Sequence, residues 1–347
     1  METGHQRNAL EELIVKSKPV LNGVLWTLGE THLSKGKDSY AASQEEWMAE
    51  FDAMRHLGLD TLMLFTGVDR AMSRTAEAAP DIIEFIAGEC DKRGMSLIVA
   101  AGTHLRWWEN LKLPDEMKLI GGYVERICER YIHHPSFAGW YIDYEFPIRR
   151  GELGATLKDL FRETVSLCKS KTPELPVAVS PFFCPPTETN IMNFGFHEPE
   201  EYYEYWSDFI AYSRFDILAL QDNGGQHLSF FEESDTEPYI AAFARACREN
   251  GCRFWGNVET GEFEIGSARE FTDLYGVHGC VNKIDERWRA VPMERLKRKL
   301  VTMSRYSEKN LSWGYQPFYR PGAGAAGAAA YRAYETFLRQ EYPEMLI

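Results

Sequence analysis

Two acidic residues end a stretch of the sequence that is otherwise apolar and aromatic. Residues 137–146 are predicted to form a buried strand, with Asp143 and Glu145 near its carboxyl end. Side chains two residues apart in an extended strand point to the same face, so both carboxylates would share one environment. Because a buried charge without a partner is costly, either cations neutralise the pair or the pair lies at a wet opening where it does chemistry.

Polar side chains also occur where other predicted strands end. Asp222 closely follows the strand 216–220, and Asn257 and Glu259 lie on one face of the stretch 255–259. In barrels of parallel strands, active sites lie at the carboxyl ends of the strands. Carboxylates from several strands would therefore converge on one opening.

Two carboxyl groups across an opening are the groups that glycoside hydrolysis uses. One protonates the leaving oxygen, and the other attacks the anomeric carbon or activates water. Apolar, aromatic surroundings raise the pKa of one carboxyl while the other stays ionised. We predict Glu145 and Glu259 as the catalytic pair, with Asp222 and Asp143 as supporting or alternative catalytic residues.

Aromatic and polar residues near the same strand ends could bind a sugar, because aromatic faces stack on the apolar faces of sugar rings and polar groups bind the hydroxyls. The alternative is that the tryptophans fill the gap between strands and helices. Two adjacent tryptophans in a loop are harder to bury together. The candidate substrate-binding residues are Trp26, Glu30, His104, Trp107, Trp108, Tyr144, Gln221, Asn257, Trp313 and Tyr315.

Each acidic residue also has a structural interpretation. The carboxylates near residue 145 could pair with Arg149 or Arg150 in the following loop. Asp222 precedes Asn-Gly-Gly, and Asp often organises such turns through its side chain. Glu259 is followed by two more glutamates within five residues, so it could belong to a solvated acidic loop.

The elements that must position these residues alternate between strand and helix along the whole chain. Ser43 and Glu46 form a predicted capping box, and Gly94 is predicted to end another helix. The predicted strands are 20–28, 61–65, 96–101, 137–146, 176–180, 216–220, 253–258 and 311–315, and the predicted helices begin near residues 43, 81, 115, 156, 200, 237, 292 and 328.

Eight strand–helix units predict an α/β fold in which parallel strands are joined by right-handed crossovers. The length favours a closed (β/α)8 TIM barrel in a single domain, with an open doubly wound sheet as the alternative. We predict an N-terminal extension over residues 1–18 and the barrel over 19–347. An insertion is expected around 262–290, after the seventh strand.

The composition of the chain argues against some classes of binding partner. The net charge of -14 argues against nucleic acid or an anionic membrane surface. The sequence has neither a secretory signal nor an apolar run long enough to cross a bilayer, and its seven scattered cysteines suit reduced, buried thiols. We therefore predict a cytoplasmic protein with a carbohydrate substrate and no cofactor; the oligomeric state cannot be read, and a removed leader remains an alternative.

The stretches GWYIDYE and ALQDNGG give the chain a resemblance to TIM-barrel glycoside hydrolases. It most resembles a bacterial domain-of-unknown-function family of glycosidase-like barrels. The resemblance implies Glu145 as acid/base on strand four and Glu259 as nucleophile on strand seven, with retention of configuration. The sequence departs from the largest clan at position 144, where Tyr144 replaces an Asn, so Asp222 stays an alternative member of the pair.

Two other functions fit the same barrel. A metal-dependent hydrolase, isomerase or lyase could use Asp143, Glu145, Asp222 and His104, because carboxylate oxygens suit magnesium, manganese or calcium. A carbohydrate-binding barrel without catalysis is the other alternative.

Two further motifs have simpler interpretations. Residues 322–327 match G-x-G-x-x-G, but a dinucleotide fold needs a further strand, so a tight turn into an alanine-rich helix is expected, with a phosphate site as the alternative. His133 and His134 are expected to cap the carboxyl end of a helix.

Overall fold

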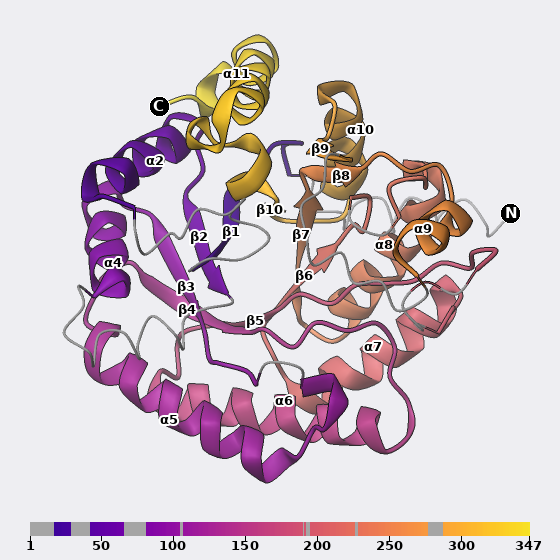
Figure 1. Ribbon diagram of the computed structural model, residues 1–347. Coiled ribbons are helices and arrows are strands. Elements are labelled where there is room, and N and C mark those ends of the chain that lie inside the picture. The colour runs from indigo at the N-terminus through magenta and orange to yellow at the C-terminus, as the bar shows by residue number, and fades with distance from the viewer. Residues whose placement is uncertain are drawn as a thin grey trace, which may run out of the picture.

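The protein is a closed barrel of eight parallel strands surrounded by helices (Figure 1). The computed structural model describes residues 17–28, 42–65, 81–104, 107–189, 191, 195–225, 228–276 and 287–347. The strands follow the order β1-β10-β7-β6-β5-β4-β3-β2, and the ring closes because β1 pairs with both β10 and β2. The predicted (β/α)8 barrel is confirmed, and the open sheet is excluded.

The barrel strands are short and lie between long helices. The strands are β1 Gly23–Thr27, β2 Thr61–Phe65, β3 Ser96–Ala100, β4 Phe137–Ile142, β5 Val177–Val179, β6 Ile217–Gln221, β7 Arg253–Glu259 and β10 Asn310–Trp313. The helices around them are α2 Gln44–His56, α4 Ile82–Arg93, α5 Leu113–Tyr131, α6 Gly151–Lys171, α7 Pro199–Ser213, α8 Glu233–Glu249, α10 Met293–Ser304 and α11 Gly324–Glu341.

Local sequence signals explain several helix ends. The backbone N–H of Glu46 donates to Ser43 Oγ, and the Ser43 N–H donates back to Glu46, which confirms the capping box at the start of α2. Gly94 ends α4 with φ of 61°, a left-handed conformation that glycine adopts without steric cost. Pro292, by contrast, is the N-cap of α10 rather than its first residue.

The predicted strand 137–146 is too long. β4 ends at Ile142, which pairs with Val179, the last residue of β5. Beyond that point β5 offers no further strand partner, so Asp143 and Glu145 lie in the segment that follows β4.

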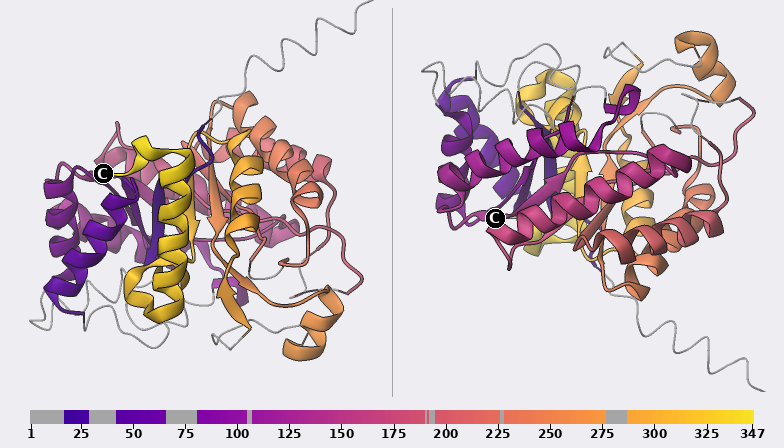
Figure 2. Two further views of the ribbon diagram at one scale, coloured as in Figure 1. Left: turned by 90° about the horizontal axis from the view of Figure 1, so that it is seen from above. Right: turned by 90° about the horizontal axis from the view of Figure 1, so that it is seen from below.

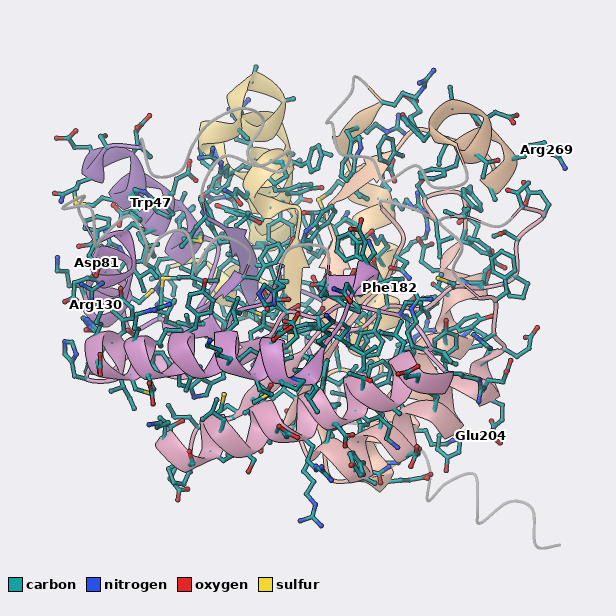
Figure 3. All side chains as sticks on the ribbon, turned by 60° about the horizontal axis from the view of Figure 1, so that its bottom comes forward. Trp47, Asp81, Arg130, Phe182, Glu204 and Arg269 are labelled. Atoms are coloured by element: carbon teal, nitrogen blue, oxygen red, sulfur yellow. The ribbon has the colours of Figure 1, made fainter. Side chains whose placement is uncertain are left out.

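Side chains fill the layer between strands and helices (Figure 3). Trp47 of α2 packs on Trp26 of β1 with ring centroids 5.1 Å apart, and Asp81, the N-cap of α4, lies near Arg130 of α5. A large part of the stability comes from this apolar layer, because burial of apolar surface is the dominant favourable contribution to folding.

A small sheet and a helix project from one end of the barrel (Figure 2). They are β8 Gly261–Phe263, α9 Ala268–Tyr275 and β9 Trp288–Ala290, with β8 and β9 antiparallel, and they occupy the segment that we predicted as an insertion. Residues 1–16 of the predicted extension lie outside the described residues. No helix in the described part of the chain is both long and apolar enough to cross a membrane.

Candidate active site at the carboxyl ends of the strands

The segment after β4 places one glutamate in a partly buried, polar setting. Tyr141, inside the barrel, donates its hydroxyl hydrogen to Glu145 Oε1 at 2.6 Å. Asp143 lies between them in the chain and close enough to Tyr141 to act on it electrostatically. Burial raises the pKa of the Glu145 carboxyl above its ordinary value, although hydrogen bonds from Tyr141 and Gln221 oppose the shift.

Hydrogen bonds link this glutamate across three further strands. Gln221, at the end of β6, donates through Nε2 to the Ser180 carbonyl at 2.9 Å. Asn257 of β7 donates to Ser180 Oγ at 3.0 Å, and its own oxygen accepts from the Trp313 backbone N–H at 3.0 Å. The side chains thus span β4 to β10 inside the barrel, which fixes their positions.

Glu259, at the end of β7, has a different environment. Its side chain is buried, and Oε2 accepts the Gly225 N–H at 2.7 Å. Any side chain at Gly225 would meet this carboxylate, because a Cβ there would lie 2.5 Å from Glu259 Oε2. The solvated-loop interpretation of Glu259 is therefore wrong.

Asp222 supports the backbone around Glu259. Its Oδ1 accepts the N–H groups of Glu259 and Gly224, at 3.2 and 3.1 Å. Its Oδ2 lies 3.2 Å from Nζ of Lys299, a buried lysine on α10 that also donates to the Glu259 carbonyl. Asp222 therefore has the turn-organising role that its sequence context predicted, and it is neutralised by an ion pair.

Several predicted sugar-binding aromatics lie outside the barrel interior. Trp26 packs on α2, and Tyr144 is buried against Trp107 while its hydroxyl donates to Glu116 of α5. Tyr315 is fully buried in the π-helical turn Tyr315–Tyr319, η3. These three side chains have no exposed face on which a sugar could stack, as the gap-filling interpretation expected.

Other aromatics keep accessible surface. Trp108 is 57% exposed in the short helix η2, Trp107–Glu109, and contacts Trp107 edge to face. Trp313 is partly exposed at the end of β10, beside Trp288 of β9. Trp108 and Trp313 are the predicted aromatics best placed to stack on a sugar.

His104 pairs with Glu116 of α5. Its Nδ1 lies 2.8 Å from Glu116 Oε1, and with Trp107 it lines a cleft of about 750 Å³ beside α5 that also includes Lys118 and Arg126. Glu30 lies outside the described residues. Arg150 pairs with Glu201 of α7.

The ligands of the metal-dependent alternative do not gather in one place. His104 is bonded to Glu116, and Asp222 faces Lys299. Within the described ranges, Asp143, Glu145, Asp222 and His104 do not form a group of three possible ligands.

The glycine-rich turn at 322–327 binds the carboxylate of Glu50. The Gly322 N–H donates to Glu50 Oε1 at 3.0 Å, and Arg320 pairs with the same carboxylate. A side chain at Gly322 would collide with Glu50. An internal carboxylate therefore stands where a phosphate would bind, and the turn leads directly into α11 as expected.

Sequence reasoning missed three residues of this region. Tyr141 shares its face with Asp143 and Glu145 by the two-residue period of a strand, so the pattern could have revealed it. Ser180 directly follows β5, and its position at a strand end was a usable signal. Lys299 carried no signal, because a lysine on an amphipathic helix is ordinarily exposed.

This fold and the side chains at its strand ends define a (β/α)8 barrel with carboxylates at the end where enzymes of this fold act. The profile described as "Domain of unknown function (DUF4434)" matches residues 22–325. The chain belongs to this family, and the resemblance predicted from the sequence is confirmed. A comparison with curated protein sequences finds no match.

Solved structures of the same fold include glycoside hydrolases. A proposed alpha-L-fucosidase from Bacteroides thetaiotaomicron VPI-5482 is 18% identical, with a TM-score of 0.70 over 94% of this chain and 95% of that one. The endo-1,4-beta-D-mannanase of Thermotoga petrophila RKU-1 is 13% identical, with a TM-score of 0.53 over 85% of this chain and 88% of that one. At these identities the likeness establishes the fold.

Proposed function

We propose that the protein is a glycoside hydrolase in which Glu145 is the general acid/base and Glu259 is the nucleophile. The observation that carries the proposal is the pair of glutamates at the carboxyl ends of β4 and β7, with the barrel-lining residues between them joined by hydrogen bonds. The carbohydrate-active names of structures with the same fold add support.

The two environments favour different protonation roles. Burial favours the neutral, proton-bearing form of Glu145, which an acid must hold before it can protonate a leaving oxygen. Glu259 accepts a backbone N–H at Oε2, a contact that stabilises a carboxylate and fixes its direction. Asp222 accepts the Glu259 N–H and Lys299 donates to the Glu259 carbonyl, so both fix the backbone of Glu259. Burial and the negative charges of Glu145 and Asp143 raise the pKa of the Tyr141 hydroxyl, which keeps it a hydrogen-bond donor.

Retention of configuration follows from this assignment. A nucleophilic Glu259 would form a glycosyl–enzyme intermediate that water then hydrolyses, with Glu145 acting first as acid and then as base. Gln221 and Trp313 are partly exposed at their strand ends and would contact the sugar, whereas Asn257 is buried and would hold the neighbouring residues in place. Trp108 would provide a stacking surface at the rim.

A panel of 4-nitrophenyl glycosides tests the proposal, including alpha-L-fucoside and beta-D-mannoside. We expect release of 4-nitrophenol from at least one member. Glu145→Gln and Glu259→Gln should abolish most of it, while the exposed-residue controls Glu152→Gln and Glu264→Gln keep wild-type rates. Full turnover in both active-site variants on a cleaved substrate would refute the assignment.

The same panel addresses the two other functions. Activity that survives treatment with a chelator disfavours a catalytic metal, and activity lost with the chelator and restored by a divalent ion supports the metal-dependent alternative. Binding of sugars without cleavage of any panel member would support the non-catalytic barrel.

A further inference from the structure

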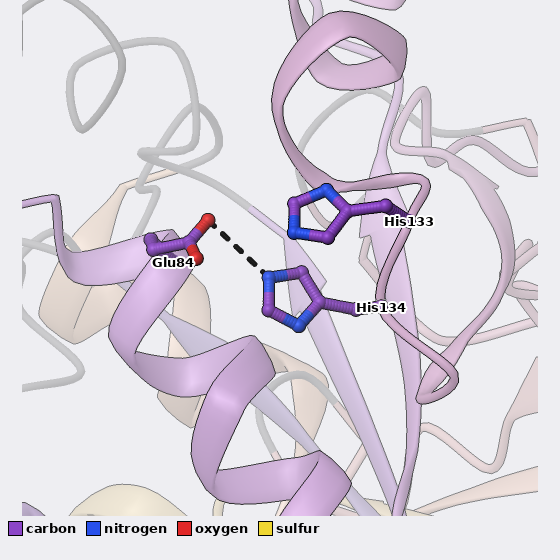
Figure 4. A group of neighbouring side chains, drawn as sticks. All are labelled: Glu84, His133 and His134. Atoms are coloured by element: carbon purple, nitrogen blue, oxygen red, sulfur yellow. Dashed lines mark ion pairs between the residues drawn. The ribbon is translucent and has the colours of Figure 1, made fainter.

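A histidine pair and a glutamate meet between a helix and a turn on the outside of the barrel (Figure 4). Glu84 lies in the first turn of α4, and His133 and His134 lie in the turn between α5 and β4. One possible ligand atom from each residue lies within 4.8 Å of the other two. Among the described residues, no other three side chains of His, Cys, Asp or Glu bring possible ligand atoms this close together.

A carboxylate behind His134 fixes its ring. His134 Nδ1 lies 2.6 Å from Asp91 Oδ2, and the other Asp91 oxygen accepts the Ser136 N–H at 2.8 Å. Since the carboxylate can only accept, Nδ1 carries the hydrogen. Metal-binding histidines commonly donate their second ring nitrogen to a carboxylate in this way. The expected capping role is wrong for His134, because its side chain faces Asp91 and Glu84 instead of the last carbonyls of α5.

The remaining nitrogen of His134 is buried and points at the other two side chains. The His134 side chain is only 8% exposed, and its Nε2 has no hydrogen-bond donor or acceptor in proper geometry. Nε2 nevertheless lies 3.3 Å from Glu84 Oε2. This contact is satisfied either by a second proton on the ring or by a metal cation between Nε2 and the carboxylate oxygen.

The separation matches a shared metal ion. Zinc binds histidine nitrogen and carboxylate oxygen at about 2.0–2.2 Å, which puts two ligands of a tetrahedral ion about 3.3–3.5 Å apart. The exposed side chains of Glu84 and His133 can rotate to complete the set. Calcium and magnesium prefer oxygen ligands, so two imidazoles favour zinc or a similar transition metal.

We propose that Glu84, His133 and His134 bind a zinc ion, with water as the fourth ligand and Asp91 orienting His134. The ion would tie α4 to the turn that leads into β4. Because the segment that follows β4 carries Glu145, the site would support the helix layer around that strand without contacting the substrate.

Zinc titration of the full chain tests the site. Protein stripped with a chelator is titrated with zinc in competition with a chromophoric chelator, for wild type, Glu84→Gln and His133→Gln. Both substituted residues are exposed, so both variants should fold. We expect one zinc ion per wild-type chain and an affinity at least about tenfold weaker in each variant.

His56→Gln is the matched control, because His56 also pairs with a glutamate, Glu335, and has a side chain 39% exposed. Its zinc affinity should equal that of the wild type. Cobalt added to the stripped wild type should give the visible absorption of a four-coordinate ion, and His133→Gln should lose it. Equal zinc affinity in wild type and both ligand variants, or no binding at micromolar zinc, would overturn the proposal.

Discussion

The two candidate catalytic glutamates occupy opposite kinds of environment in one barrel. Glu145 follows β4 beside neutral side chains, Tyr141 and Gln221, and burial raises its pKa. Glu259 ends β7 with its carboxylate on a backbone N–H, and the segment around it is held by the buried Asp222–Lys299 ion pair.

This difference shows how two glutamates in one barrel could serve as acid/base and as nucleophile. Burial among neutral groups favours the proton-bearing form of a carboxyl, whereas a backbone N–H that donates to a carboxylate favours the charged form. The barrel supplies both surroundings because successive strands end beside different loops.

Substitution of Glu259 should have the largest effect. Glu259→Gln keeps the size of the side chain and removes the nucleophile, so we expect kcat to fall by about 10⁴-fold or more. The loss should be the same for good and poor leaving groups, since the attacking group is missing in both cases. Steady-state kinetics with aryl glycosides of graded leaving-group acidity measure it.

Glu145→Gln should show the opposite dependence on the leaving group. Removing a general acid costs about 10²–10⁴-fold where the leaving oxygen needs a proton. A 2,4-dinitrophenyl glycoside needs none, so its glycosylation step should be nearly unaffected in a pre-steady-state burst. An equal loss with both leaving groups would show that Glu145 is not the acid.

Lys299→Met tests the support behind Glu259. The substitution leaves Asp222 buried without its cation, which typically costs about 3–5 kcal/mol of unfolding free energy. Urea denaturation measures the loss. Lys297→Met, on the same helix but more exposed, should cost far less, and Asp222→Asn added to Lys299→Met should restore part of the stability. A Lys299→Met protein as stable as the control would contradict the proposed role.

The pH dependence should show the smallest effect. Because the pKa of Glu145 is raised from 4.5 by burial, the folded protein holds this proton more tightly than the unfolded chain. Its contribution to stability is complete below about pH 4.5 and is lost as the pH rises through the folded pKa. Glu145→Gln should therefore melt at a higher temperature than the wild type above that range.

Activity should follow the same group. The wild-type kcat/KM should fall as the pH rises through the raised pKa of Glu145, because the deprotonated carboxyl cannot donate. The residual activity of Glu145→Gln should lack this alkaline decline on the same substrate, which must have a leaving group that needs the proton. A decline of the same midpoint in both proteins would assign it to another residue.

The barrel could be predicted because its signals are local. The capping box at Ser43, the glycine at position 94 and the continuous apolar run 61–65 each define an element through neighbouring residues. The end of β4 could not be predicted in this way, because it depends on where the neighbouring strand β5 stops pairing with it. The closed barrel was predicted from the count of alternating strand–helix units and from the length of the chain.

The candidate site could be predicted only in part from the sequence. Strand-end position made Glu145, Asn257 and Glu259 candidates, but the face that a flanking aromatic side chain takes depends on the helix packed against it. Tyr144 is thus buried under α5, although its neighbours in the chain face the barrel interior. Lys299, the ion-pair partner of Asp222, lies 77 residues further along the chain on α10, and no spacing in the sequence predicts such a contact.

Chemical rescue of Glu259 tests the central claim most directly. Glu259→Gly is assayed with azide on a 2,4-dinitrophenyl glycoside that the wild type cleaves, and the product is identified by proton NMR. If Glu259 is the nucleophile, azide restores turnover and yields a glycosyl azide of inverted configuration. Wild-type hydrolysis by Glu259→Gly without azide, or rescue that gives the retained azide, would contradict the account.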